Sequence, residues 1–204
     1  MATVQIKTPI QCSSKRKEDD SKYPYLRSKY YKKCIEVYQQ GYGITTTEKP
    51  FISTFGAGSC IAIVGYCKET RTAFMVHADT FKFLSNNIGT LYYHLNKVSE
   101  AFQMYDMYLF GGNYGESSEE FAKCIEYKFE SFNHNWRNRI EIKFHSSYIN
   151  QNIKNICIDS KTGKFYSIDP KKCILPNNVG FMENWALKCQ INALIGYTHM
   201  TKYE

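Results

Sequence analysis

Residues 54–66 read Thr54-Phe-Gly-Ala-Gly-Ser-Cys60-Ile-Ala-Ile-Val-Gly-Tyr66, and residues 72–79 read Thr72-Ala-Phe-Met-Val-His-Ala-Asp79. The apolar, β-branched run that begins at Cys60 is typical of a buried strand, and the run that begins at Thr72 predicts a second one. The polar residues Lys68-Glu-Thr-Arg71 separate the two runs and predict a turn. The sequence therefore predicts a β-hairpin at this position.

Two registers of this hairpin bring Cys60 close to His77. In one register Cys60 lies opposite His77. In the other, whose turn is centred one residue later, Cys60 lies opposite Asp79 and diagonal to His77. Directly opposed residues have Cβ atoms about 4.5–5.5 Å apart and diagonal ones about 7–8 Å apart. Because both registers keep the three side chains on one face of the sheet, either one places an imidazole within reach of the thiol.

A thiol beside an imidazole suggests nucleophilic chemistry. A cysteine thiol, with a pKa of about 8.5, is mostly protonated at neutral pH, and an adjacent histidine can take its proton to form the thiolate. The small residues 56–59 let the backbone bend and expose amide N–H groups to a developing oxyanion. Thr54 and Asp79 are both candidates to orient His77. The alternative interpretation is a buried structural Cys60 and a core His77.

The rest of the chain predicts further strands and two good helices. An apolar stripe at helical spacing indicates a helix over residues 84–102, and Ser117 with Glu120 forms a capping-box pattern that predicts the start of another. Residues 23–42 show weak helical periodicity, and residues 185–195 suggest a last helix. Strands are expected over 107–110, 139–145, 153–158 and 165–168, with Gly163 in the turn between the last two. The sum is an α/β protein.

Charge and hydropathy exclude several classes of protein. Of the net charge of +7, +6 belongs to residues 1–33, which hold nine bases and three acids, so the body is nearly neutral and nucleic-acid binding is not expected. No apolar run reaches the roughly 18 residues of a membrane helix, and Met1–Asp20 lacks a signal-peptide core. We expect residues 1–22 to form a flexible basic arm and residues 23–204 to form a single domain.

The cysteines and histidines do not suggest a metal centre. The eight cysteines include no Cys-x-x-Cys pair, which zinc ribbons and dithiol redox sites require. The thiols are therefore expected to be reduced and mostly buried. His94, His134 and His145 lack metal-ligand spacing. Neither a metal ion nor an organic cofactor is expected.

Three motifs resemble a known family. Thr54, Gly58-Ser59-Cys60 and His77 resemble the chemoreceptor glutamine deamidase CheD, in which a Thr lies six residues before the Cys and the His seventeen residues after it. Leu109-Phe-Gly-Gly112 resembles that family's strand ending in Phe-Gly-Gly, and Asp159-Ser-Lys-Thr-Gly163 resembles its Asp-x-x-Thr-Gly hairpin. The likeness covers about residues 50–168. The N-terminal asparagine amidohydrolases are similar in the same places, including His77-Ala-Asp79, and the cytotoxic necrotizing factor deamidases share the fold.

The resemblance implies an α/β (α+β) fold in which sandwich-like central β-sheets are flanked by helices. It also implies a cysteine-dependent amidohydrolase that converts a Gln or Asn carboxamide of a protein substrate to the carboxylate. Cys60 is then the nucleophile, His77 the base and Thr54 its partner, with Ser59, Gly58 and Asp79 lining the site. We expect a monomer that acts in the cytoplasm or is translocated into a host cell by a specialised secretion system. The alternatives are a binding module on the same fold and a related cysteine hydrolase or transglutaminase.

Overall fold

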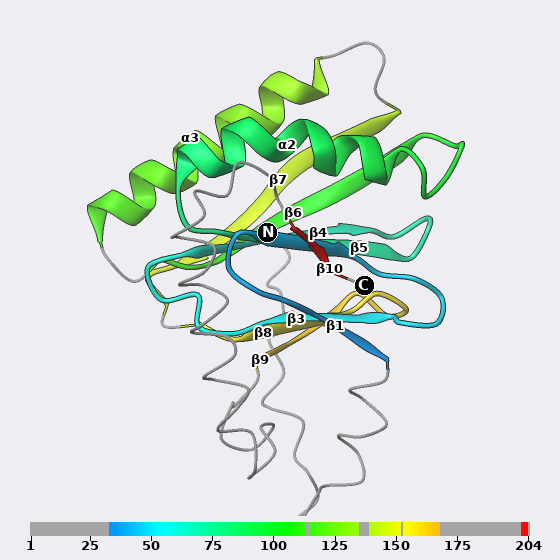
Figure 1. Cartoon of the computed structure of the whole chain (residues 1–204), viewed down its shortest axis with the longest axis horizontal. Helices are drawn as coiled ribbons and strands as arrows, with labels where there is room; N and C mark the ends of the chain where they lie inside the picture. Colours follow the sequence, from blue (N-terminus) through cyan, green and yellow to red (C-terminus); the bar gives the residue numbers. More distant parts are fainter. Residues whose placement is uncertain (1–32, 113–114, 135–138, 152, 168–200, 204) are drawn as a thin grey trace, which may run out of the picture.

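The computed structural model describes residues 33–112, 115–134, 139–151, 153–167 and 201–203. These residues form three layers, with two helices packed on a six-stranded sheet and a four-stranded sheet beneath it (Figure 1). The prediction of an α+β fold with sandwich-like sheets and helices is confirmed. The expected arm at residues 1–22 and the expected helix at residues 185–195 lie outside the described residues.

The larger sheet contains the predicted hairpin at its centre. Its strand order is β10-β2-β5-β4-β6-β7, and every pair is antiparallel except β10–β2 and β6–β7. The bounds are β2 Gly41–Ile44, β4 Ile61–Cys67, β5 Thr72–Ala78, β6 Gln103–Gly111, β7 Ile140–Ile149 and β10 Thr201–Tyr203.

The smaller sheet has the order β1-β3-β8-β9, in which β1 and β3 run parallel. Its bounds are β1 Cys34–Val37, β3 Phe51–Thr54, β8 Ile156–Asp159 and β9 Lys164–Ser167. Strands β8 and β9 form the expected hairpin, and Gly163 adopts a φ of 67°. The weak helical periodicity over residues 23–42 was misleading, because its described part contains β1 and the start of β2.

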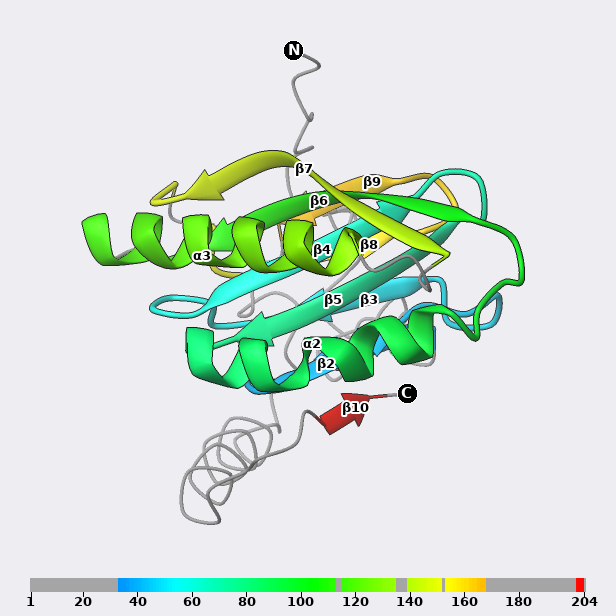
Figure 2. The same ribbon diagram turned by 90° about the horizontal axis from the view of Figure 1, so that it is seen from above.

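Both helices lie across the outer face of the larger sheet (Figure 2). Helix α2, Phe81–Leu95, is capped by Thr80, whose hydroxyl accepts from the Phe83 amide at 3.3 Å. The helix predicted over residues 84–102 is too long at its C-terminal end, because α2 ends at Leu95 and Phe102 is 60% exposed. Helix α3, Glu116–Asn133, begins after Gly115 without a side-chain cap, so the predicted capping box is wrong. None of the described helices is both long and apolar enough to cross a membrane.

Two hydrophobic clusters separate the three layers. One lies between the helices and the larger sheet and includes Ile61, Ile63, Val76 and Leu84. The other lies between the two sheets and includes Ala62, Met75, Ile52 and Ile158. Since neighbouring residues of a strand point to opposite faces, each strand of the central hairpin contributes to both clusters. A side chain at every second position of β4 and β5 therefore points into the layer between the sheets.

Candidate functional site

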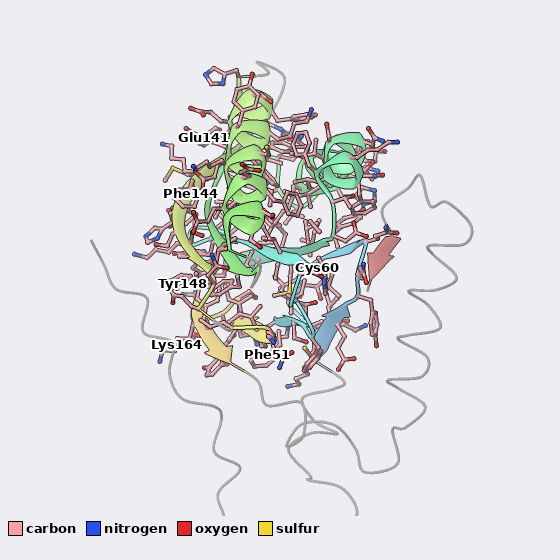
Figure 3. The ribbon with its side chains drawn as sticks, turned by 90° about the vertical axis from the view of Figure 1, so that its left-hand side faces the viewer. Phe51, Cys60, Glu141, Phe144, Tyr148 and Lys164 are labelled. Atoms are coloured by element: carbon pink, nitrogen blue, oxygen red, sulfur yellow. The ribbon has the colours of Figure 1, made fainter. Side chains whose placement is uncertain are left out.

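Cys60 and His77 lie on the same face of the larger sheet. In the observed register Ile61 pairs with Ala78 and Ala62 with His77, which is the diagonal one of the two registers considered. Cys60 directly precedes β4 and follows the same alternation as Ala62, which packs between the sheets. Figure 3 shows Cys60 at the centre of the molecule, between the two layers of strands. The register therefore aligns the thiol diagonally with the imidazole, with a Cβ separation of about 7–8 Å or slightly less.

A hydrogen bond between the sheets holds the imidazole. Thr54 Oγ1, on β3 of the smaller sheet, lies 2.7 Å from His77 Nδ1 on β5 of the larger one. Thr54 is two residues beyond Ile52 on the same strand, so its side chain also points into the layer between the sheets. Most side chains in this layer are apolar, whereas Thr54 is polar. Both Thr54 and His77 are fully buried.

The partners of Thr54 determine the tautomer of His77. The Thr54 hydroxyl also donates to the Val37 carbonyl at 2.7 Å. Since a hydroxyl has one proton and a carbonyl can only accept, Thr54 Oγ1 accepts from Nδ1–H of His77. Nε2 then carries the lone pair. Within the described part of the chain Nε2 is buried and has no hydrogen-bond partner.

Burial also keeps this imidazole neutral. Desolvation lowers the pKa of His77 from 6.5 to about 4, although the negative charge of Asp79 acts in the opposite direction. A neutral ring with an open Nε2 is the form that can accept a proton from a thiol. The same low pKa makes the protonated ring a strong acid once it has formed.

Asp79 does not hold the ring in this structure. Its Oδ2 accepts from the side-chain amides of Gln39, at 3.2 Å, and Gln40, at 2.7 Å. Its Oδ1 accepts from the Thr80 hydroxyl at 3.3 Å. Of the two candidate orienting groups, Thr54 therefore makes the hydrogen bond to His77, and Asp79 acts on it only through its charge.

The loop before Cys60 has most of its amides engaged. The Gly56 N–H donates to Asn155 Oδ1, the Ala57 N–H to the Lys154 carbonyl, and the Gly58 N–H to the Gly56 carbonyl. By contrast, the Ser59 N–H meets no acceptor among the described residues. Ser59 is exposed, whereas Cys60 is 7% exposed. The loop thus leaves the Ser59 amide, next to Cys60 in the chain, to stabilise an oxyanion, while Gly56, with a φ of 71°, shapes the turn.

The Phe-Gly-Gly motif forms a wall behind this loop. Gly111 has a φ of +93°, and a Cβ there would lie 2.3 Å from the Ala57 carbonyl and 2.6 Å from that of Cys60. The Gly112 N–H donates to the Cys60 carbonyl at 3.0 Å. At the end of β6 the backbone of Gly111 therefore packs directly against the backbone of the loop before β4, and only glycine, which has no Cβ, allows so close an approach. The Asp159–Gly163 hairpin lies elsewhere, with Gly163 against the ring of Tyr66.

Several contributors to the site carried no signal in the sequence. Val37 acts through its carbonyl, which any residue possesses, and Gln39 and Gln40 belong to a polar segment with no motif. Asn155 accepts a hydrogen bond from the Gly56 amide of the loop, although the two residues are 99 positions apart in the sequence. Only the pairing of strands from different sheets brings these groups together.

The arrangement is that of a potential cysteine–histidine nucleophilic site with a threonine as third member. Among the described residues, no three His, Cys, Asp or Glu side chains are grouped so that they could hold a metal ion. Comparison of the sequence with models of known families gave no match, and comparison with curated proteins gave none either.

Proposed function

We propose that this protein is a cysteine-dependent amidohydrolase that hydrolyses the carboxamide of a Gln or Asn residue in a protein substrate. The observation that carries the proposal is the Thr54 hydroxyl, which accepts from Nδ1 of His77 and leaves Nε2 as an unprotonated base on the face that Cys60 shares. A buried histidine with a purely structural role normally has its polar atoms paired, whereas Nε2 of His77 has no partner among the described residues.

The first half-reaction uses Cys60 as nucleophile. His77 Nε2 takes the thiol proton, and the sulfur attacks the carboxamide carbon to form a tetrahedral oxyanion, which accepts from the Ser59 N–H. The C–N bond then breaks as the imidazolium returns its proton to the leaving nitrogen, which departs as ammonia. A low His77 pKa favours this second transfer, because a strongly acidic imidazolium protonates a poor leaving group well.

The second half-reaction hydrolyses the thioester. Water gives a proton to Nε2 and its oxygen attacks the acyl carbon, after which the C–S bond breaks and Cys60 regains the proton. The substrate gains one negative charge. The exposed Ser59 and the half-buried Asp79 mark the side from which a substrate loop can reach the sulfur. No metal or organic cofactor enters the scheme. We further propose that the protein acts as a monomer, in the cytoplasm or after translocation into a host cell.

A proteome-wide deamidation screen tests the reaction directly. Wild-type protein is incubated with cell lysates, and peptides are searched for a mass increase of about one dalton together with ammonia release. Cys60→Ala is the inactive comparison, and Cys124→Ala, which removes an exposed thiol of α3, is the matched control. We expect the signal to persist in Cys124→Ala and to vanish in Cys60→Ala. Deamidation that survives Cys60→Ala contradicts the proposal.

The complete burial of Thr54 and His77 favours a second candidate, a binding module in which their hydrogen bond merely ties the sheets together. Thiol alkylation separates the two functions without a known substrate. An activated Cys60, although 7% exposed, should react with iodoacetamide faster than the exposed Cys124 at pH 7. A binding module should instead label at Cys124 first. Incorporation of an added primary amine would identify a transglutaminase.

A further inference from the structure

A cavity lies at the end of β5 opposite to His77. It has a volume of about 1120 Å³ and is formed by the loop of residues 45–50, the turn at residues 70–72, the end of α2 with the residues that follow, and residues 160–161. Thr72 lines it, five residues before His77, so roughly 17 Å of extended strand separates it from the Cys60 site. It is therefore independent of the proposed active site.

The cavity concentrates positive charge. Lys49, Arg71, Lys97 and Lys161 line it, and Glu48 is the single acidic residue in its lining. Residues 34–204 as a whole carry a net charge of only +1. With +3 at the cavity, the rest of that body is net negative, so the charge is not a general property of the surface. Within the described part of the chain, none of the four cations forms an ion pair.

Hydroxyl groups line the cavity between the cations. Seven Thr and Ser residues contribute to the wall. Ser160 also lines the cavity, and only 2% of this residue is exposed.

The walls of the cavity are held in place by hydrogen bonds. The Thr45 hydroxyl donates to the Ala73 carbonyl and accepts from the Ala73 amide. The Lys49 amide donates to Thr46 Oγ1, and the Ser160 amide donates to the Pro50 carbonyl. The loop that carries Lys49 is thus attached to both sheets. A ligand would meet a largely formed site and would cost little ordering.

We propose that this cavity binds a compact polyanion bearing several phosphate or sulfate groups. Four cations offer donors to several anionic oxygens at once, and those lining hydroxyls that do not already donate within the protein can add to them. The lining holds no Phe, Tyr or Trp among the described residues, and the ring of its histidine, His94, already packs edge-on against Tyr42 and Tyr93. The cavity therefore favours a ligand without a nucleobase.

Titration calorimetry on the full chain tests the proposal, with tripolyphosphate and sucrose octasulfate as separate probes. We expect at least one of the two probes to bind. The double variant Lys97→Ala/Lys161→Ala should weaken that binding at least about tenfold, and Ser160→Ala about threefold. Added salt should also weaken it.

The matched control is Lys82→Ala, an exposed lysine at the opposite end of α2. It should change the affinity less than about twofold, since single exposed charges act weakly at a distance. The proposal is overturned if neither probe binds at millimolar concentration. It is equally overturned if Lys82→Ala weakens binding as much as the double variant, because the attraction would then be a property of net charge.

Discussion

The two ends of strand β5 are built for opposite purposes. At its C-terminal end, His77 is fully buried, neutral and held by a single hydrogen bond from another sheet. Near its N-terminal end, Arg71 is exposed, adopts a φ of 52° and faces a cavity lined by three further cations. One end depends on a group being kept away from water, whereas the other depends on charges that water still reaches.

This contrast teaches where each kind of perturbation should act. A buried base loses its function when a hydrogen bond or its burial is disturbed, because in a low-dielectric setting the lost interaction cannot be replaced by water. A solvated cationic cavity should respond to salt and to charge removal, and little to the loss of one hydrogen bond. The following changes probe the buried end, in order of decreasing effect.

Removal of the imidazole should have the largest effect. In His77→Ala, the alkylation of Cys60 by iodoacetamide at pH 7 should slow by about 10³-fold, because no base remains to take the thiol proton. Peptide mapping by mass spectrometry gives the rate at each cysteine, and Cys124 provides the reference within the same sample. An unchanged ratio of Cys60 to Cys124 labelling would remove the nucleophile assignment.

Substitution of the orienting hydroxyl should come next. Thr54→Val keeps the shape but leaves Nδ1–H of His77 and the Val37 carbonyl unpaired, at a cost of roughly 1–3 kcal/mol for each buried group. Cys60 labelling should fall on the order of 100-fold. Thr54→Ser retains the hydroxyl and should restore most of the rate. If serine fails as badly as valine while both proteins fold, the hydrogen bond is not what matters.

The pKa of His77 should appear as a pH dependence of stability. Between about pH 6.5 and 4 the unfolded chain binds a proton at this residue and the folded chain does not, so stability falls as the pH falls. From pH 7 to pH 5 the loss should be about 2 kcal/mol. Urea unfolding of wild type and His77→Gln at both values measures it. A glutamine variant with the same pH dependence as wild type contradicts the buried neutral state.

Neutralising Asp79 should have the smallest effect. Asp79→Asn removes the charge that raises the pKa of His77, so this pKa should fall further below 4 and the base should stay neutral at pH 7. Labelling of Cys60 at pH 7 should therefore change by less than about threefold. A loss comparable to that of Thr54→Val would transfer the orienting role to Asp79.

The sequence predicted well what depends on neighbours along the chain. The hairpin from Cys60 to Asp79 needs a four-residue polar turn and two β-branched runs, and pairing across a short turn allows few registers. The β8–β9 hairpin was accessible for the same reason, through Gly163. Both are local decisions in which propensity and tertiary packing agree.

Prediction from the sequence failed where the role of a residue depends on contacts with a distant part of the chain. Gly41 and Gly43 look like chain breakers, yet β2 includes both, and a Cβ on Gly43 would lie 2.9 Å from side-chain atoms of Ile35 and Ile52. Here glycine permits a close approach between the sheets, which no local pattern reveals. Similarly, the contact of Thr54 with His77 joins two sheets, so residue spacing alone left Thr54 and Asp79 as equal candidates.

Gly111 has a consequence for how mutational data on this protein should be interpreted. An alanine there would push on the carbonyls of residues 57 and 60 and shift the sulfur, although the residue need never touch a substrate. Gly89→Ala in α2, whose new methyl group would meet only the Phe132 ring at 3.8 Å, provides the harmless comparison. A saturation screen scored by activity alone would rank position 111 beside the nucleophile. Sensitivity at Gly111 would mean that its backbone must hold the loop of Cys60 in place, and not that the residue takes part in the reaction.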